Sequence, residues 1–226
     1  MGDFKEIYQT QAEKYDQMVS QEDYEGNLLP ALQRLRPLQK LTAVELGAGT
    51  GRFTAMLAPI VENIIAFDMS HHMLETAVDN LQGQAPVAVA DNRAIPLPSA
   101  MADLVIAGWS FAHSISWYPD SWQEEVGKML AESKRLLKPD GTIILIETLG
   151  TGNEKPHPPT LWLAEYYKWL ETVHGFNVTW IRTDYLFHSV EEGAELTRFF
   201  FGDTMADDIL RQQLTILPEC TGIWWL

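Results

Sequence analysis

Short apolar runs alternate with helical patterns between residues 41 and 150. The runs are apolar along their whole length, which is typical of strands buried on both faces of a parallel sheet. The stretches between them carry apolar residues at helical spacing. The pattern predicts an α/β fold with a doubly wound, mostly parallel sheet. The five predicted strands are residues 41–46, 64–67, 87–90, 103–107 and 142–146.

Capping and turn residues mark the ends of these elements. Ser70 is a favourable N-cap for a helix over 71–81. Ser121 and Glu124 have the spacing of a capping box at the start of another helix. The Pro-Asp-Gly sequence at 139–141 predicts a turn before the fifth strand.

The two ends of the chain have a different pattern. Helical spacing covers residues 3–19 and 28–35, before the first strand. A loop rich in Gly and Pro at 150–160 separates the alternating core from the C-terminal part. The elements predicted after it are helices over 161–173, 189–201 and 205–214, and strands over 176–181 and 221–226.

The segment V-E-L-G-A-G-T-G-R-F at residues 44–53 predicts a ligand-binding turn. An apolar run precedes three glycines, Gly47, Gly49 and Gly51, and a helical pattern follows. A residue without a Cβ adopts positive φ freely and lets another atom approach the backbone. The helix start adds unpaired N–H donors and the positive end of a dipole. The alternative is a tight turn without a ligand.

The residues around the glycines narrow the choice of ligand. A dinucleotide fingerprint, G-x-G-x-x-G, needs glycine where this chain has Arg52, and a phosphate loop needs a lysine after Gly51. Glu45 would repel a pyrophosphate and attract a cation. The segment therefore favours S-adenosylmethionine, which carries sulfonium and ammonium charges and no phosphate. A nicotinamide-dependent oxidoreductase is the alternative that Arg52 disfavours.

Three acidic residues lie at the ends of successive predicted strands. Glu45, Asp68 and Asp91 are spaced 23 residues apart. Open α/β sheets bind ligands beyond the carboxyl ends of their strands, where an acid after the second strand accepts hydrogen bonds from a ribose diol. The third acid can accept from an amine such as adenine N6. One such acid alone is as typical of a helix N-cap, but three in succession predict a shared rim.

The chain resembles the class I S-adenosylmethionine-dependent methyltransferases, and within them the small-molecule group called type 11. The resemblance covers roughly residues 40–150 and rests on V-E-L-G-A-G-T-G-R-F, F-D-M-S-H-H-M-L, V-A-D-N-R-A-I-P-L-P-S-A-M-A-D-L-V and L-L-K-P-D-G-T-I-I-L-I. It implies a Rossmann-like seven-stranded sheet whose last strand, at about 223–226, is antiparallel. It also implies one methyltransferase domain over 1–226. The parts of that domain would be an N-terminal helical cap (1–40), a cofactor-binding core (41–150) and a C-terminal substrate-side segment (151–226).

The resemblance also implies roles for individual residues. Asp68 would bind the ribose hydroxyls and Met69 would pack on the adenine. Asp91 and the backbone of Asn92 would read the adenine amine, and backbone near Gly108 would take the α-ammonium group. The residues expected to bind the cofactor are Tyr15, Glu45, Gly47, Ala48, Gly49, Asp68, Met69, Asp91, Asn92 and Gly108.

Tyr15 is the one member of this set that lies outside residues 40–150. It is expected to cap the cofactor from the N-terminal helix, the alternative being an ordinary half-buried contact. Methyl transfer from a sulfonium requires positioning and exclusion of water, and a base only where the acceptor loses a proton. His113, after the fourth strand, is the candidate catalytic base, with a structural histidine as the alternative. Glu147, after the fifth strand, is a weaker candidate.

Aromatic residues gather after residue 160. They indicate either an acceptor pocket or a packed subdomain, and packing is the favoured interpretation. No set of His, Asp and Glu has the spacing of a zinc or two-metal site, so no metal is expected. The aromatic residues concerned are Trp162, Tyr166, Tyr167, Trp169 and Trp180.

Composition narrows the class of partner. The formal net charge of −15 over 226 residues argues against binding to nucleic acid or an anionic membrane, since both require clustered Lys and Arg. Cys220 is the one cysteine, so no intrachain disulfide is expected. The chain has no apolar run of about 20 residues and no signal-peptide pattern at its N-terminus. We expect a cytoplasmic monomer or homodimer.

We therefore expect an enzyme, an S-adenosylmethionine-dependent methyltransferase. It would transfer a methyl group to an unidentified small-molecule acceptor by in-line displacement. The alternative is a non-catalytic S-adenosylmethionine-binding module that acts through a protein partner, because this chemistry requires no diagnostic catalytic residue.

Overall fold

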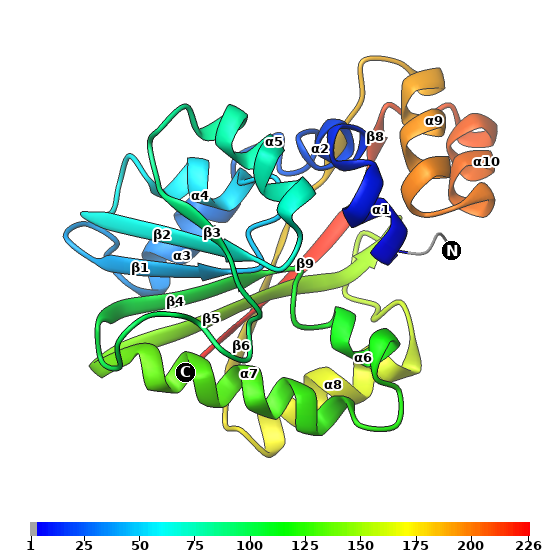
Figure 1. Cartoon of the computed structure of the whole chain (residues 1–226). Helices are drawn as coiled ribbons and strands as arrows, with labels where there is room; N and C mark the ends of the chain where they lie inside the picture. Colours follow the sequence, from blue (N-terminus) through cyan, green and yellow to red (C-terminus); the bar gives the residue numbers. More distant parts are fainter. Residues whose placement is uncertain (1–3) are drawn as a thin grey trace.

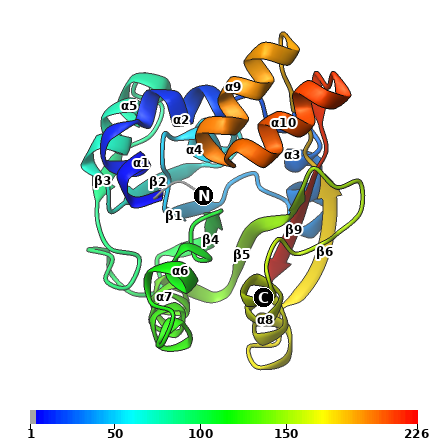
Figure 2. The same cartoon turned by 90° about the vertical axis from the view of Figure 1, so that its right-hand side faces the viewer.

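The computed structural model describes residues 4–226 and is built around a seven-stranded sheet (Figure 1). Helices cover both faces of this sheet (Figures 1 and 2). The strands, in their order across the sheet, are β3 (Val87–Val89), β2 (Asn63–Asp68), β1 (Thr42–Leu46), β4 (Ala102–Gly108), β5 (Leu137–Thr151), β9 (Glu219–Trp225) and β6 (Asn177–Arg182).

The strand order reverses next to β1. The chain runs from β1 outward through β2 to β3 and then crosses back to β4 on the other side of β1. These strands and β5 pair in parallel, whereas β9 is antiparallel to both β5 and β6. The predicted doubly wound, mostly parallel sheet with an antiparallel last strand is confirmed. The reversal leaves a crevice at the carboxyl ends of β1 and β4, where such folds bind ligands.

The helices form two layers. One face of the sheet is covered by α3 (Leu28–Leu35), α4 (Arg52–Leu57) and α5 (His71–Leu81), and the other by α7 (Trp122–Leu136) and α8 (Leu161–Thr172) (Figures 1 and 2). The remaining helices lie near the carboxyl ends of the strands (Figures 1 and 2). They are α1 (Phe4–Thr10), α2 (Ala12–Val19), α6 (His113–Trp117), α9 (Val190–Phe200) and α10 (Asp203–Gln212).

Alternate residues of the strands supply the two apolar cores. In β4, Leu104 and Ile106 pack with α3 and α4, and Val105 and Ala107 pack with α7 and α8. The two-residue period of a strand sends successive side chains to opposite faces. Strands buried on both faces are therefore apolar throughout, as the sequence pattern indicates.

The C-terminal part contains a small second sheet that the sequence pattern does not predict. It pairs β7 (Tyr185–Leu186) with β8 (Ile216–Leu217). Met18 of α2 packs fully buried into the apolar cluster of these strands with α9 and α10. The N-terminal helices are thus fixed to the C-terminal segment. None of the helices within residues 4–226 combines the length and apolarity needed to cross a membrane.

Several local predictions are wrong in detail. The helix expected over 3–19 is broken at Gln11, whose φ of −136° and ψ of 37° are not helical. The capping box is absent, because the Ser121 side chain makes no cap hydrogen bond and Glu124 pairs with Lys128 instead. The turn expected at 139–141 lies inside β5 as an irregularity in its pairing with β4, where Ala102 pairs with Leu137 and Leu104 with Thr142. The predicted Ser70 cap is confirmed, since its side chain accepts from the N–H of Met73.

Candidate functional site

The glycine turn between β1 and α4 adopts left-handed backbone conformations. Gly47, Gly49 and Gly51 have φ of 77°, 57° and 85°, where a residue with a Cβ is strained. The N–H of Gly47 donates to the carbonyl of Phe67 in β2 at 2.7 Å. A Cβ on Gly47 would lie 1.9 Å from Oγ of Ser110. Position 47 therefore requires glycine for space as well as for conformation.

Asp68 joins the end of β2 to this turn. Its carboxylate accepts the N–H of Gly49 at 2.9 Å and the N–H of Ser70 at 2.8 Å. Burial raises the pKa of Asp68, and the backbone donors oppose that rise. A carboxylate accepts about four hydrogen bonds, so Asp68 retains lone pairs for a ligand after fixing the turn.

A cavity of about 510 Å³ lies over the carboxyl ends of β1, β2 and β4. This volume is within the range of small-molecule sites. All the residues that the sequence assigned to the cofactor line it, together with His113. The ten cofactor candidates are Tyr15, Glu45, Gly47, Ala48, Gly49, Asp68, Met69, Asp91, Asn92 and Gly108. The structure brings them together, and the ligand that each one binds stays a prediction.

Glu45 is the buried acid of the cavity wall. The residue is 2% exposed, and Thr54 donates a hydrogen bond of 2.5 Å to its carboxylate. Burial raises the pKa of Glu45 to about 8, although the Thr54 hydrogen bond lowers it. Burial therefore favours the protonated form of Glu45, and a positive charge close to it would favour the charged form.

Asn92 and Ser110 face the glycine turn from the neighbouring loops. The Asn92 amide donates to Oγ of Ser110 at 3.0 Å. Among the described residues, no group bonds to the buried Oδ1 of Asn92. A buried acceptor without a partner is costly, and this one lies in the cavity wall. Ser110 was not predicted from the sequence, because its role depends on the space above Gly47.

The N-terminal helices cover the cavity. The rings of Tyr8 and Tyr15 lie 5.5 Å apart, edge to face, on either side of the break at Gln11. Ser70 donates to the carbonyl of Tyr8 at 2.6 Å. Burial raises the pKa of Tyr15 to about 12, so its hydroxyl stays protonated. The location of Tyr15 in the cavity wall near Gly49 is compatible with the expected capping role.

His113, the candidate base, is half-buried at the start of α6. Its Nε2 and the Tyr8 hydroxyl are hydrogen-bonded at 2.8 Å, and its ring stacks on Trp117 with centroids 5.3 Å apart. Burial lowers the pKa of His113 to about 4, although a hydrogen bond with the Trp109 backbone raises it. The imidazole is therefore neutral at pH 7.

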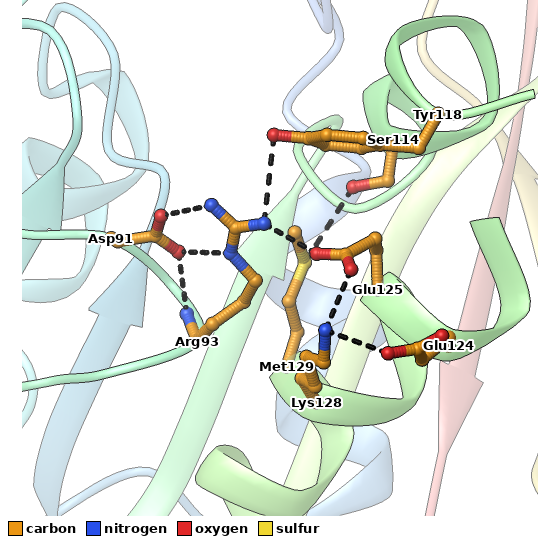
Figure 3. Close-up of polar contacts among 8 residues, drawn as sticks. All are labelled: Asp91, Arg93, Ser114, Tyr118, Glu124, Glu125, Lys128 and Met129. Atoms are coloured by element: carbon orange, nitrogen blue, oxygen red, sulfur yellow. Dashed lines mark hydrogen bonds and ion pairs between the residues drawn. The ribbon is translucent and has the colours of Figure 1, made fainter. Parts of the chain in front are cut away.

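Asp91, just after β3, forms an ion pair. Its carboxylate binds the guanidinium of Arg93, which also binds Glu125 of α7 (Figure 3). The hydrogen bond from Arg93 lowers the pKa of Asp91. The sequence did not reveal Arg93 as a site residue, since its partner on α7 is 32 residues away.

Arg52 is a second cation in the cavity wall that the sequence did not assign to the site. It donates to the Val19 carbonyl and to the Glu22 carboxylate, both at 2.9 Å. Its guanidinium lies 4.5 Å from the ring centroid of Trp109, within the range of a cation–π contact. Trp109 has a φ of 48°, a strained value of the kind found at functional sites.

Other candidates lie away from the cavity. Glu147 is 2% exposed and accepts the N–H of Ala112 at 3.0 Å, so it supports the loop before α6 rather than lining the cavity. The aromatic residues of the C-terminal segment do not line it either. Tyr166 and Tyr167 are buried in the core, which confirms the packing interpretation for them.

Comparison with known proteins relates part of the chain to a family. Residues 44–145 match a family model described as a methyltransferase domain. A malonyl-[acyl-carrier protein] O-methyltransferase of Hahella chejuensis is 28% identical over 142 residues, which are 62% of this chain and 47% of that protein. The chain thus spans about half the length of this relative.

Solved structures support the fold. A SAM-dependent methyltransferase from Aquifex aeolicus superposes with a TM-score of 0.55 and 17% identity, covering 98% of this chain and 92% of that one. The [4+2]-cyclase SpnF has a TM-score of 0.56 and 17% identity, covering 88% and 79%. At this identity the likeness concerns the fold alone. Residues 44–145 thus match the methyltransferase family, and the fold around them is that of class I S-adenosylmethionine-dependent methyltransferases.

Proposed function

We propose that this protein binds S-adenosylmethionine in the cavity and transfers its methyl group to a small-molecule acceptor by in-line displacement. The observation that carries the proposal is the rim of three acids, Glu45, Asp68 and Asp91, around one glycine turn and one cavity. Such a rim suits a ligand with positive charge, hydroxyl groups and an amine. It does not suit a pyrophosphate.

The residues of the cavity fit this cofactor. The buried Oδ1 of Asn92, which has no partner among the described residues, offers an acceptor to a ligand N–H. Glu45 is buried with a pKa of about 8, and a neighbouring cation would favour its charged form. Asp68 retains free lone pairs after binding Gly49 and Ser70. Each of these groups gains a partner when an adenosyl sulfonium occupies the cavity.

The chain's own contribution to the reaction is positioning and exclusion of water. When bound, the cofactor supplies an activated methyl group on a positively charged sulfur. The helices α1 and α2 cover the cavity, with Tyr8 and Tyr15 in its wall. Holding two reacting atoms in line and away from water accounts for a large part of the rate enhancement in such transfers.

In this proposal, His113 takes a proton from the acceptor. The neutral Nε2 of His113 lies 2.8 Å from the Tyr8 hydroxyl in the cavity wall. With a pKa of about 4, this ring is a weak base. It therefore accepts a proton only as the arriving methyl group makes the acceptor acidic.

The weakness of this base also favours a second candidate function. A non-catalytic module that binds the cofactor and acts through a protein partner would need the cavity but no base. A fold neighbour named for a different reaction, the cyclase SpnF, is in line with the rule that fold does not fix chemistry.

Calorimetric titration and an acceptor screen test the proposal. We expect binding of S-adenosylmethionine and S-adenosylhomocysteine and none of NAD. Binding of NAD without S-adenosylmethionine would contradict the proposal. The acceptor panel, read out with a methyl-labelled cofactor, includes carboxylates because the Hahella relative is an O-methyltransferase of a malonyl group. Cofactor binding without transfer to any acceptor of a broad panel would favour the non-catalytic module.

A further inference from the structure

Arg93 occupies a position that the proposed cofactor site does not by itself require. It follows β3 on the same loop as Asp91, lines the cavity and bridges two acids, Asp91 and Glu125 of α7 (Figure 3). The bridge connects the rim of acids to α7, whose Met129 also lines the cavity.

On the cavity side, Arg93 uses most of the hydrogen-bonding capacity of Asp91. Oδ1 of Asp91 accepts the backbone N–H of Arg93 at 2.9 Å and its Nε–H at 2.8 Å. Oδ2 accepts the Nη2–H. Because a carboxylate offers about four acceptor positions, these bonds leave about one, on Oδ2. The carboxylate can rotate only by breaking a bidentate pair.

On the other side, two residues, Glu125 and Tyr118, hold the guanidinium in place. Nη1 donates to one carboxylate oxygen of Glu125, whose other oxygen accepts from Lys128 at 2.7 Å. Nη1 also lies 3.5 Å from the Tyr118 hydroxyl, and the guanidinium carbon lies 5.5 Å from the ring centroid of Tyr118 (Figure 3). A planar guanidinium held in this way has a fixed orientation, which a lysine at the same position would not reproduce.

We propose that Arg93 is a positioning residue that makes the site selective for a 6-aminopurine nucleoside over a 6-oxopurine nucleoside. The inference rests on the proposed function, in which Asp91 meets the adenine amine. The single open position on Oδ2 accepts an N–H from a 6-amino group. A 6-oxo group presents an acceptor there, and two facing acceptors repel each other. A carboxylate free to rotate would turn toward the N1–H of the oxopurine and would lose this discrimination.

Titration calorimetry with S-adenosylhomocysteine and its deaminated analogue, S-inosylhomocysteine, tests the inference. Loss of one hydrogen bond to a charged group predicts a preference of at least about tenfold for the adenosyl compound in the wild type. We expect R93M and R93K to weaken adenosyl binding by about tenfold and to reduce the preference to less than about threefold. Inosyl binding should change by less than about threefold.

Arg135 provides the matched control. It also pairs with an acid three residues earlier, Glu132, and donates to the carbonyls of Ile95 and Leu97, but it does not line the cavity. R135K should leave both affinities and their ratio as in the wild type. Thermal unfolding of each variant establishes that it is folded.

Three outcomes would contradict either the inference or the proposed function, and they can be told apart. Equal weakening of both ligands in the Arg93 variants would show a purely structural role and overturn the inference. A wild-type preference near one would overturn it as well. A wild type that binds neither nucleoside would instead refute the proposed function on which the inference depends.

Discussion

Replacement of Asp68 by Asn is the sharpest test of the acid rim. Asp68 holds the N–H of Gly49 at 2.9 Å and the N–H of Ser70 at 2.8 Å. An asparagine keeps the shape but offers one oxygen acceptor, and its NH₂ group would face one of the two donors. The change therefore removes the charge, misaligns the glycine turn and leaves less acceptor capacity for a ribose diol.

The expected loss follows from the hydrogen bonds concerned. A hydrogen bond to a charged group contributes about 1.5–3 kcal/mol. Loss of one such bond to the ligand weakens binding roughly 10- to 150-fold. We expect D68N to weaken S-adenosylhomocysteine binding by this amount in titration calorimetry at pH 7.5.

Asp103 is the matched control for D68N. Its carboxylate also accepts from a backbone N–H, that of Thr42 at 2.9 Å, and from Lys138 at 2.8 Å. It lies at the start of β4, at the opposite end of the sheet from the cavity. D103N should lower stability but leave cofactor affinity within about twofold of the wild type. Equal affinities of D68N and D103N would refute the reasoning.

Further predictions concern pH dependence and the glycine turn. Burial lowers the pKa of His113 to about 4, so its contribution to stability is present above about pH 6.5 and is lost as pH falls toward 4. H113Q should therefore lose about 2 kcal/mol less than the wild type between pH 7.5 and 5 in urea unfolding, and parallel profiles would contradict this. Burial raises the pKa of Glu147 to about 8, so its contribution is present below about pH 4.5 and lost as pH rises through 8. E147Q should flatten the profile by about 1.4 kcal/mol per pH unit between pH 5 and 8, and an unchanged slope would place the Glu147 pKa elsewhere. G83A should cost about 1 kcal/mol by denaturant unfolding, because Gly83 has a φ of 81° with open space around it. G47A should cost about 1–3 kcal/mol more, because its Cβ would meet Ser110, and equal costs would show that this contact relaxes freely.

The fold could be predicted from the sequence because the features that indicate it are local along the chain. Apolar runs bounded by polar residues mark the five parallel strands of the core, and the glycines of the turn mark the β1–α4 connection. Even so, local signals fail where competing contacts satisfy the same groups. Glu124 of the predicted capping box, for example, binds Lys128 instead of capping α7.

The shared location of the three acids was also predictable from the sequence. Parallel strands end at the same edge of a sheet, so acids at successive strand ends share a rim whatever the details of packing. Glu45, Asp68 and Asp91 accordingly line one cavity. Their spacing along the chain was therefore sufficient to predict that they lie around one cavity.

What the sequence determined, then, was the sheet, the glycine turn and the acids around it. The tertiary structure alone decided which residues the side chains of the site contact, and these contacts set the charge and orientation of those side chains. Tyr8 meets His113 across 105 residues, and Arg52 meets Glu22 across 30. Periodicity and capping rules describe neighbours along the chain, whereas burial and ion pairing depend on elements that only packing brings into contact. The charge of His113 and the orientation of Asp91 are therefore properties of the folded molecule.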